Sequence, residues 1–358
     1  HRGLNARGEV MITRFDFGTD AMASCGDPDY ETGFTGREAV TDCDEGHLIR
    51  VFENGSDDLD PTIMPRELTV AGQLENAYHS TSFTWTDADG SAREMVAIGY
   101  VTSGSVRFYE YSQGTYSFVD VLQTPLAVTG RLGFHPTAEE PFLIAGGGYN
   151  NVSQLCSINL VRSFSESDEA VYSHSLPSNG GRKIYAFDFT PDGKDLLVVN
   201  RSGLATGSPG TDSFANSLVR LDASLQRATE QTDSGEWDDT ALRPAMTVKD
   251  TVLLDGRATD VKAFTKADGQ EVIAVTGFDN NKLSLFSSDG DVLRLDMRWN
   301  LDSDGTTPTG VGEGPVALEY TQRGGKDLLL VLNFFEHSLS VFDVTANSAN
   351  DYTLLMKV

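Results

Sequence analysis

The chain has 358 residues, with 53 acidic and 27 basic side chains and a formal net charge of −26. Hydrophobic residues make up 39% of it, which is enough for a core and excludes a disordered chain. No apolar run approaches the roughly 20 residues that a membrane helix needs, so we expect no membrane insertion. The charge also repels phosphate backbones, which argues against nucleic acids and anionic membranes as partners.

A short strand, a polar turn and a second, more apolar strand recur five times along the chain. The turns are rich in Asp, Gly, Pro and Lys, which is typical of tight connections between strands. The five pairs of predicted strands are 83–86 with 95–98, 132–135 with 142–145, 186–190 with 196–200, 261–265 with 272–275, and 316–321 with 328–333.

Further strands follow these pairs, and helical periodicity is almost nowhere sustained. Alternating third strands are predicted at 106–111, 217–221, 282–286 and 338–343, and fourth strands at 115–122, 246–254 and 352–358. Units of four strands, spaced about 50 to 75 residues apart, are typical of a β-propeller. We therefore predict an all-β chain, a single β-propeller domain over 1–358 with six blades of four antiparallel strands.

The N-terminal region fits this pattern incompletely. Strands are predicted at 10–15, 47–52 and 66–70, which leaves only residues 1–5 for the innermost strand of the first blade. Five residues extend over about 17 Å at most, so we expect that they do not supply this strand alone. A seventh blade could lie only in 223–243, and the sequence there predicts a loop instead.

The chain contains three cysteines. Cys25 and Cys43 lie in a polar loop insertion, 18–46, where a disulfide would stabilise a segment with little hydrophobic patterning. Cys156 lies in an apolar run and is expected to be a buried free thiol. This pairing predicts a mature, secreted protein in an extracellular or periplasmic compartment; the alternative is three reduced thiols in the cytosol.

Two segments resemble a known family of propeller repeats. They are FTPDGKDLLVVN at 189–200 and GKDLLLVLN at 325–333, the latter preceded by Gly314-Pro315 and followed by LSVFD at 339–343. Both are similar to the repeats of the YVTN or lactonase-like family. That family includes lactone hydrolases, cyclases, surface-layer proteins and binding proteins, so the resemblance implies a fold and does not select an activity.

In a propeller, the loop between the second and third strands shares one face with the loop that enters the next blade. The longer insertions of this chain, 18–46, 146–151, 202–216 and 301–314, all fall on that face. Loops on a rigid scaffold often carry binding sites, so this is the candidate functional face. The alternative is that these loops merely tolerate insertion.

Carboxylates and amides recur where the second strands end, and in a propeller they would point towards the central channel. The residues at these ends are Asp16, Asn150, Asn200, Asp279 and Asn333. Oxygen ligands of this kind suit calcium, and the resemblance to six-bladed lactonases implies a calcium ion held by such a ring. The alternative is that asparagine ties the loop through side-chain hydrogen bonds.

A second candidate for calcium lies in the loop that enters the last blade. Asp302-Ser303-Asp304-Gly305 has the start of a calcium-loop pattern, and Glu313 lies nearby. The further ligands of that pattern are missing at the required spacing.

Three charged residues, Arg182, Arg257 and Glu313, each lie eight residues ahead of a threonine near the end of a first strand. They should therefore stand at the same height at the mouth of the channel. Two converging guanidiniums would bind the carboxylate or phosphate of a small anionic ligand. The alternative is that they pair with acidic residues between blades, and we expect at least one of the arginines to be paired.

Other catalytic patterns are missing from the sequence. The six histidines show no paired metal spacing, and there is no nucleophile elbow, P-loop or dinucleotide fingerprint. We therefore predict a secreted propeller that acts by binding, as a scaffold in an extracellular or periplasmic assembly or as a carrier of a small ligand. The alternative is a calcium-dependent lactonase-like hydrolase, in which a metal in the channel polarises the ester carbonyl.

Overall fold

The structure is a computed structural model of the chain, and it describes residues 2–4, 10–13, 48–52, 66–69, 77–86, 90–100, 104–112, 115–124, 129–138, 142–147, 154–160, 171–175, 182–202, 216–227, 230–231, 237–238, 242–299 and 311–358. The chain divides into two compact units, His1–Phe134 and His135–Val358. Within the described ranges, no helix is both long and apolar enough to cross a membrane.

The first sheet of the first unit contains β1 (Arg2–Leu4), β2 (Val10–Thr13), β3 (Leu48–Phe52) and β4 (Arg66–Thr69), paired in chain order. β1 pairs with β2 through all three of its residues, from Arg2 opposite Ile12 to Leu4 opposite Val10. The expectation that residues 1–5 do not supply the innermost strand alone is therefore wrong. The expectation assumed that an innermost strand needs more residues, but the three residues of β1 all pair with β2.

The second sheet of this unit contains β5 (Ala77–Thr86), β6 (Ala92–Tyr100), β7 (Ser105–Ser112) and β8 (Thr115–Gln123), and the unit ends with β9 (Thr129–Phe134). Phe83 of β5 packs against Phe134 of β9, with 4.5 Å between ring centroids, and meets Phe108 edge to face. The consecutive residues Val96, Ala97 and Ile98 of β6 are all fully buried. The second strand is thus covered on both faces, as its apolar run predicted.

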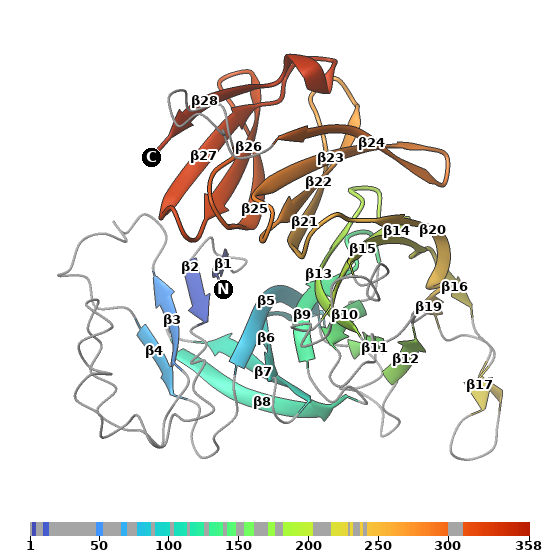
Figure 1. Ribbon diagram of the computed structural model, residues 1–358. Coiled ribbons are helices and arrows are strands. Elements are labelled where there is room, and N and C mark those ends of the chain that lie inside the picture. The colour runs from blue at the N-terminus through green and yellow to red at the C-terminus, as the bar shows by residue number, and fades with distance from the viewer. Residues whose placement is uncertain are drawn as a thin grey trace. The chain divides into compact units, whose positions relative to one another are not determined.

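The second unit begins with β10 (Phe142–Gly147), β11 (Gln154–Asn159) and β12 (Val171–Ser175), which pair in chain order. Three sheets of four antiparallel strands follow (Figure 1). They are formed by β13 (Arg182–Phe189), β14 (Asp195–Ser202), β15 (Ser217–Asp222) and β20 (Thr247–Leu253); by β21 (Ala258–Thr265), β22 (Glu271–Gly277), β23 (Lys282–Asp289) and β24 (Val292–Trp299); and by β25 (Pro315–Arg323), β26 (Lys326–Asn333), β27 (Ser338–Asp343) and β28 (Thr353–Lys357). The repeated four-stranded antiparallel sheets are confirmed.

The segment 223–243, expected to be a loop, contains short strands instead. β16 (Leu225–Arg227) pairs with β19 (Leu242–Pro244), and β17 (Glu230–Gln231) pairs with β18 (Trp237–Asp238). These two-stranded ribbons extend the connection from β15 to β20 and form no additional four-stranded sheet. Their polar sequence lacks the alternation that would have shown them as strands.

Carboxylates align neighbouring sheets of the second unit. Asp188 Oδ2 of β13 accepts a hydrogen bond from the backbone N–H of Ala263 in β21, at 2.9 Å. Asp260 Oδ2 of β21 accepts one from Leu318 N in β25, at 2.8 Å. Because each carboxylate satisfies a main-chain donor of the next innermost strand, it fixes the register between sheets.

Candidate binding site on the turns after β22 and β26

The turns that follow β22 and β26 have closely related conformations. Each has four residues, 278–281 and 334–337, and each ends at positive φ, 53° at Asn281 and 50° at His337. Phe278 begins the first turn by donating its N–H to Arg257 O, and Phe334 begins the second by donating to Gly314 O, both at 2.8 Å. Each turn is therefore tied to the segment that enters its own sheet.

Three phenylalanines, Phe278, Phe334 and Phe335, form what we call the aromatic cluster. The ring centroid of Phe335 lies 5.1 Å from that of Phe278 and 5.4 Å from that of Phe334. Phe334 and Phe335 remain 57% and 54% exposed. Such a group of adjacent exposed rings is unusual, because large exposed apolar side chains more often occur singly.

The cluster is held by one hydrogen bond between the two sheets and by one within the second of them. Gly314 donates its N–H to Asn281 Oδ1 at 2.8 Å, and Phe335 N donates to Glu313 O at 3.2 Å. Gly314 has φ +67°, and a Cβ placed on it would lie 2.7 Å from the Phe335 ring. The ring therefore rests directly on the glycine, and a side chain at position 314 would displace it.

An ion pair borders the cluster on the β22 side. Arg257 Nε donates to Asp279 Oδ2, and this hydrogen bond raises the pKa of Arg257. Nearby, Asp255 accepts hydrogen bonds from Asn280 Nδ2 at 3.0 Å and from Lys282 Nζ at 2.5 Å. The acidic groups on this side are thus neutralised by adjacent donors.

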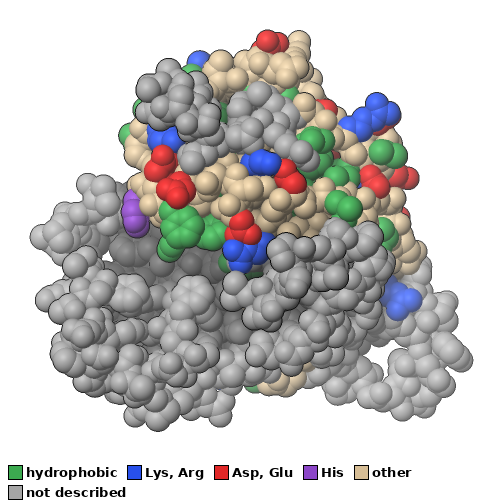
Figure 2. Space-filling model, in the orientation of Figure 1, with side chains coloured by type: hydrophobic (Ala, Val, Ile, Leu, Met, Phe, Trp, Pro, Cys, Tyr) green, Lys and Arg blue, Asp and Glu red, His purple; other side chains and the backbone are tan. Residues whose placement is uncertain are grey.

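A second ion pair borders the cluster on the β26 side. Lys357 Nζ lies 3.1 Å from both carboxylate oxygens of Glu336, which also accepts a hydrogen bond from Ser338 Oγ at 2.8 Å. Burial opposes the charged form of Glu336, but the hydrogen bonds from Ser338 and Lys357 outweigh it and lower its pKa. Glu313 is exposed and has no ion-pair partner among the described residues. Figure 2 shows hydrophobic and charged side chains side by side on this surface of the second unit.

The structure brings together two residues that the sequence assigned to different roles. Arg257, expected to bind an anionic ligand, pairs with Asp279, expected to ligate calcium. The expected equivalence of Arg257 and Glu313 is wrong by one residue, because Gly314 O accepts the Phe334 N–H as Arg257 O accepts the Phe278 N–H; Glu313 contributes its backbone carbonyl to the Phe335 N–H. β13 begins at Arg182, whose side chain lies outside the described residues.

Two asparagines of the expected calcium ring lie at strand ends and are buried. Asn333 Nδ2 donates to Ser338 Oγ at 3.1 Å and to Ser340 Oγ at 3.0 Å, and Asn200 Nδ2 lies 3.5 Å from Ser217 Oγ. These bonds tie each second strand to the third. The Oδ1 atoms of Asn200 and Asn333 are buried without a hydrogen-bond partner.

The remaining predicted ligands and the predicted disulfide lie outside the described residues; they are Asp16, Asn150, Asp302, Asp304, Cys25 and Cys43. Within the described part of the chain, no group of three or more His, Cys, Asp or Glu side chains could hold a metal ion. Cys156 is buried and free, and burial raises the pKa of its thiol to about 12.

Sequence reasoning missed the aromatic cluster. Phe334 and Phe335 directly follow the predicted strand 328–333, but large apolar residues beside a buried strand do not show whether their rings are buried or exposed. The available signal was Asn333, because an asparagine that ends a strand places the next residues in a turn.

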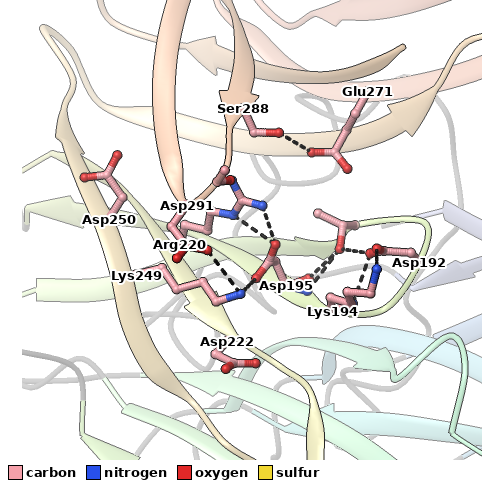
Figure 3. Close-up of polar contacts among 12 residues, drawn as sticks. Asp192, Lys194, Asp195, Arg220, Asp222, Lys249, Asp250, Glu271, Ser288 and Asp291 are labelled. Atoms are coloured by element: carbon pink, nitrogen blue, oxygen red, sulfur yellow. Dashed lines mark hydrogen bonds and ion pairs between the residues drawn. The ribbon is translucent and has the colours of Figure 1, made fainter. Parts of the chain in front are cut away.

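The other candidate site is a buried group of charged side chains where β14 begins and where β23 turns into β24 (Figure 3). Arg220 Nε donates to Asp195 Oδ2 at 3.0 Å, and Arg220 Nη1 donates to Gly290 O at 2.8 Å. Lys249 Nζ lies 2.7 Å from Asp195 Oδ1 and 3.5 Å from Asp291 Oδ1. Because Arg220 reaches the β23–β24 turn from β15, this group connects two sheets, and the charge of Asp195 is balanced by Arg220 and Lys249.

Comparison with solved structures identifies the architecture. A putative 6-phosphogluconolactonase from Bacteroides uniformis aligns with a TM-score of 0.53 and 14% identity, over 87% of this chain and 78% of that one. A hydrazine synthase structure from Kuenenia stuttgartiensis aligns with a TM-score of 0.52 and 15% identity, over 88% and 81%. The β-propeller domain of Cps50 (Swd1) from Myceliophteria thermophila aligns with a TM-score of 0.51 and 11% identity, over 88% and 80%.

These similarities and the four-stranded sheets define the chain as a β-propeller, as the sequence predicted. No protein-family model and no curated protein matches the sequence. At identities of 11 to 15% the neighbours define the fold alone.

Proposed function

We propose that this β-propeller acts by binding, as a scaffold in an extracellular or periplasmic assembly, and that the aromatic cluster is its contact surface. The observation that supports this is the presentation of Phe334 and Phe335, each more than half exposed, side by side on one turn. Aromatic side chains held in place lose little entropy on binding and dominate the energetics of many protein interfaces.

Site-specific photo-crosslinking in the native producer tests this proposal. Benzoylphenylalanine at position 334 should give a discrete adduct, which a Phe335→Ser substitution in the same chain should abolish. Position 118 is the matched control, because Phe118 is also 56% exposed but lies on β8. Equal adducts at 334 and 118, or none at 334, would contradict the proposal.

The compartment is part of the same proposal and rests on the cysteines. A disulfide between Cys25 and Cys43 would close a loop of about 17 residues and stabilise the fold by roughly 3 kcal/mol in the chain-entropy model. Mass spectrometry of the alkylated native protein should show this disulfide and one free thiol. Three alkylated cysteines would argue for the cytosol instead.

A calcium-dependent lactonase-like hydrolase is the second candidate. It is supported by the unpartnered Oδ1 atoms of Asn200 and Asn333, because amide oxygens are ligands that calcium accepts. Asp279 fits this role less well, since Arg257 already engages its carboxylate. Calcium would supply polarisation of a lactone carbonyl, and Asn200 and Asn333 would help to hold it.

Calcium titration by calorimetry and a panel of lactones separate the two candidates. The binding proposal expects no lactone turnover with or without calcium. Calcium-dependent turnover that an Asn333→Ala substitution removes, with the fold retained by circular dichroism, would favour the hydrolase. Asn347→Ala is a suitable control, because Asn347 is an exposed asparagine outside the calcium ring.

A further inference from the structure

We propose that the aromatic cluster docks a cationic segment of another protein, with the aliphatic stem of an Arg or Lys side chain lying across Phe334 and Phe335. This inference rests on the proposed binding function and adds the chemistry of the partner. It follows from the charges around the cluster and from the orientation of its rings.

The charges that border the cluster leave one carboxylate without a counterion. Asp279 is paired with Arg257, and Glu336 is paired with Lys357. Glu313, whose backbone carbonyl accepts the Phe335 N–H, is exposed and has no ion-pair partner among the described residues. The border therefore carries a net charge of −1 from three acids and two bases, on a chain whose net charge is −26.

The same pairs make an anionic partner a poor fit. A carboxylate or phosphate would need a free guanidinium or ammonium at this surface, and Arg257 and Lys357 are both already committed to carboxylates. Breaking either pair would leave an acidic side chain facing the incoming anion. A cation meets no such cost, and the field of the whole chain attracts it.

The rings supply the other half of the recognition. The planes of Phe334 and Phe335 lie at 71° to each other, so the two ring faces form an angled surface. Cations favour ring faces, and Arg and Lys carry aliphatic stems that cover apolar surface while their charges remain solvated. A purely acidic segment would be repelled by the negative charge of the border. A purely polar segment would leave the ring faces without an apolar contact.

A random 12-residue peptide display library, panned on the full-length chain, tests the inference without a known partner. We expect the enriched peptides to combine Arg or Lys with aliphatic residues. One enriched peptide is then synthesised, and its dissociation constant is measured by fluorescence polarisation at low and high salt. We expect binding to weaken with salt, because the charge contribution is screened.

Two variants with matched controls assign the binding to this surface. Phe335→Ser should weaken the peptide at least tenfold and Glu313→Gln about threefold. Phe118→Ser controls for the loss of an exposed ring, and Glu319→Gln controls for the loss of one negative charge, because Glu319 is exposed on β25. Neither control should change the dissociation constant by more than about twofold, and circular dichroism verifies that every variant is folded.

Three results would overturn the inference: no enrichment, enrichment of acidic peptides, or equal binding by Phe335→Ser and the native chain. Co-sedimentation with phosphatidylcholine vesicles that Phe335→Ser abolishes would also overturn it and assign the cluster to a lipid surface. If crosslinking at position 334 still gives its adduct in these cases, the binding function stands and only the cationic chemistry is wrong.

Discussion

The buried charge group between β15 and the β23–β24 turn allows a quantitative test of what holds neighbouring sheets together. Arg220→Met removes the guanidinium that contacts both Asp195 and Gly290 O. Losing one partner of a buried ion pair costs about 3–5 kcal/mol, because the remaining charge stays desolvated. Lys249 still lies 2.7 Å from Asp195, so we expect the lower end, a loss of about 3 kcal/mol.

The matched control is Arg294→Met, which removes the same charge from an exposed pair. Arg294 and Asp289 have side chains that are 64% and 66% exposed, and such pairs contribute about 1 kcal/mol or less. Urea unfolding is followed by circular dichroism and, because the chain has two compact units, by hydrogen exchange of peptides from β14 and β15. If Arg220→Met destabilises these strands no more than Arg294→Met, the buried group is not what joins the sheets.

Three further predictions concern single residues. Burial lowers the pKa of His135, so the stability that the neutral side chain contributes should be complete above pH 6.5 and be lost as the pH falls below that value. His135→Gln should therefore flatten the decrease in the free energy of unfolding between pH 7 and 5, measured by urea unfolding. Cys156, with a thiol pKa of about 12, should react with Ellman's reagent only after unfolding, and reaction in the native protein would contradict its burial. Gly314→Ala should destabilise the fold by about 1–2 kcal/mol and increase hydrogen exchange in the turn 334–337, because the added Cβ meets Phe335 at positive φ; unchanged exchange there would show that the ring does not rest on the glycine.

The repeated sheets could be predicted because burial on both faces leaves a clear sequence signal. Leu196 to Val199 form an uninterrupted apolar run in β14, one residue after the turn 191–194, and all four are fully buried. β1 and the ribbons between β15 and β20 gave no such signal. Their strands have two or three residues each, so neither alternation nor an apolar run can develop.

The side-chain partners at the candidate site could not be predicted from spacing. Arg257 and Asp279 are 22 residues apart, and they meet only because the Phe278 N–H binds Arg257 O and thereby brings the turn back to the segment before β21. The sequence placed both residues at the same end of the sheet, but it assigned them to separate sites. Whether an arginine faces a ligand or a neighbouring carboxylate depends on the turn conformation, which residue types alone leave open.

The two turns show why the aromatic cluster points to function rather than to folding. By their hydrogen bonds to Phe278 and Phe334, Arg257 and Gly314 occupy equivalent positions below the two turns. In the first turn the next residue is Asp279, which pairs with Arg257; in the second it is Phe335, whose ring rests on Gly314. The same backbone is therefore compatible with a solvated ion pair or with an exposed ring on a glycine. Since folding is satisfied by the first arrangement, the exposed rings of the second need another reason, and the proposed binding of a partner would supply it.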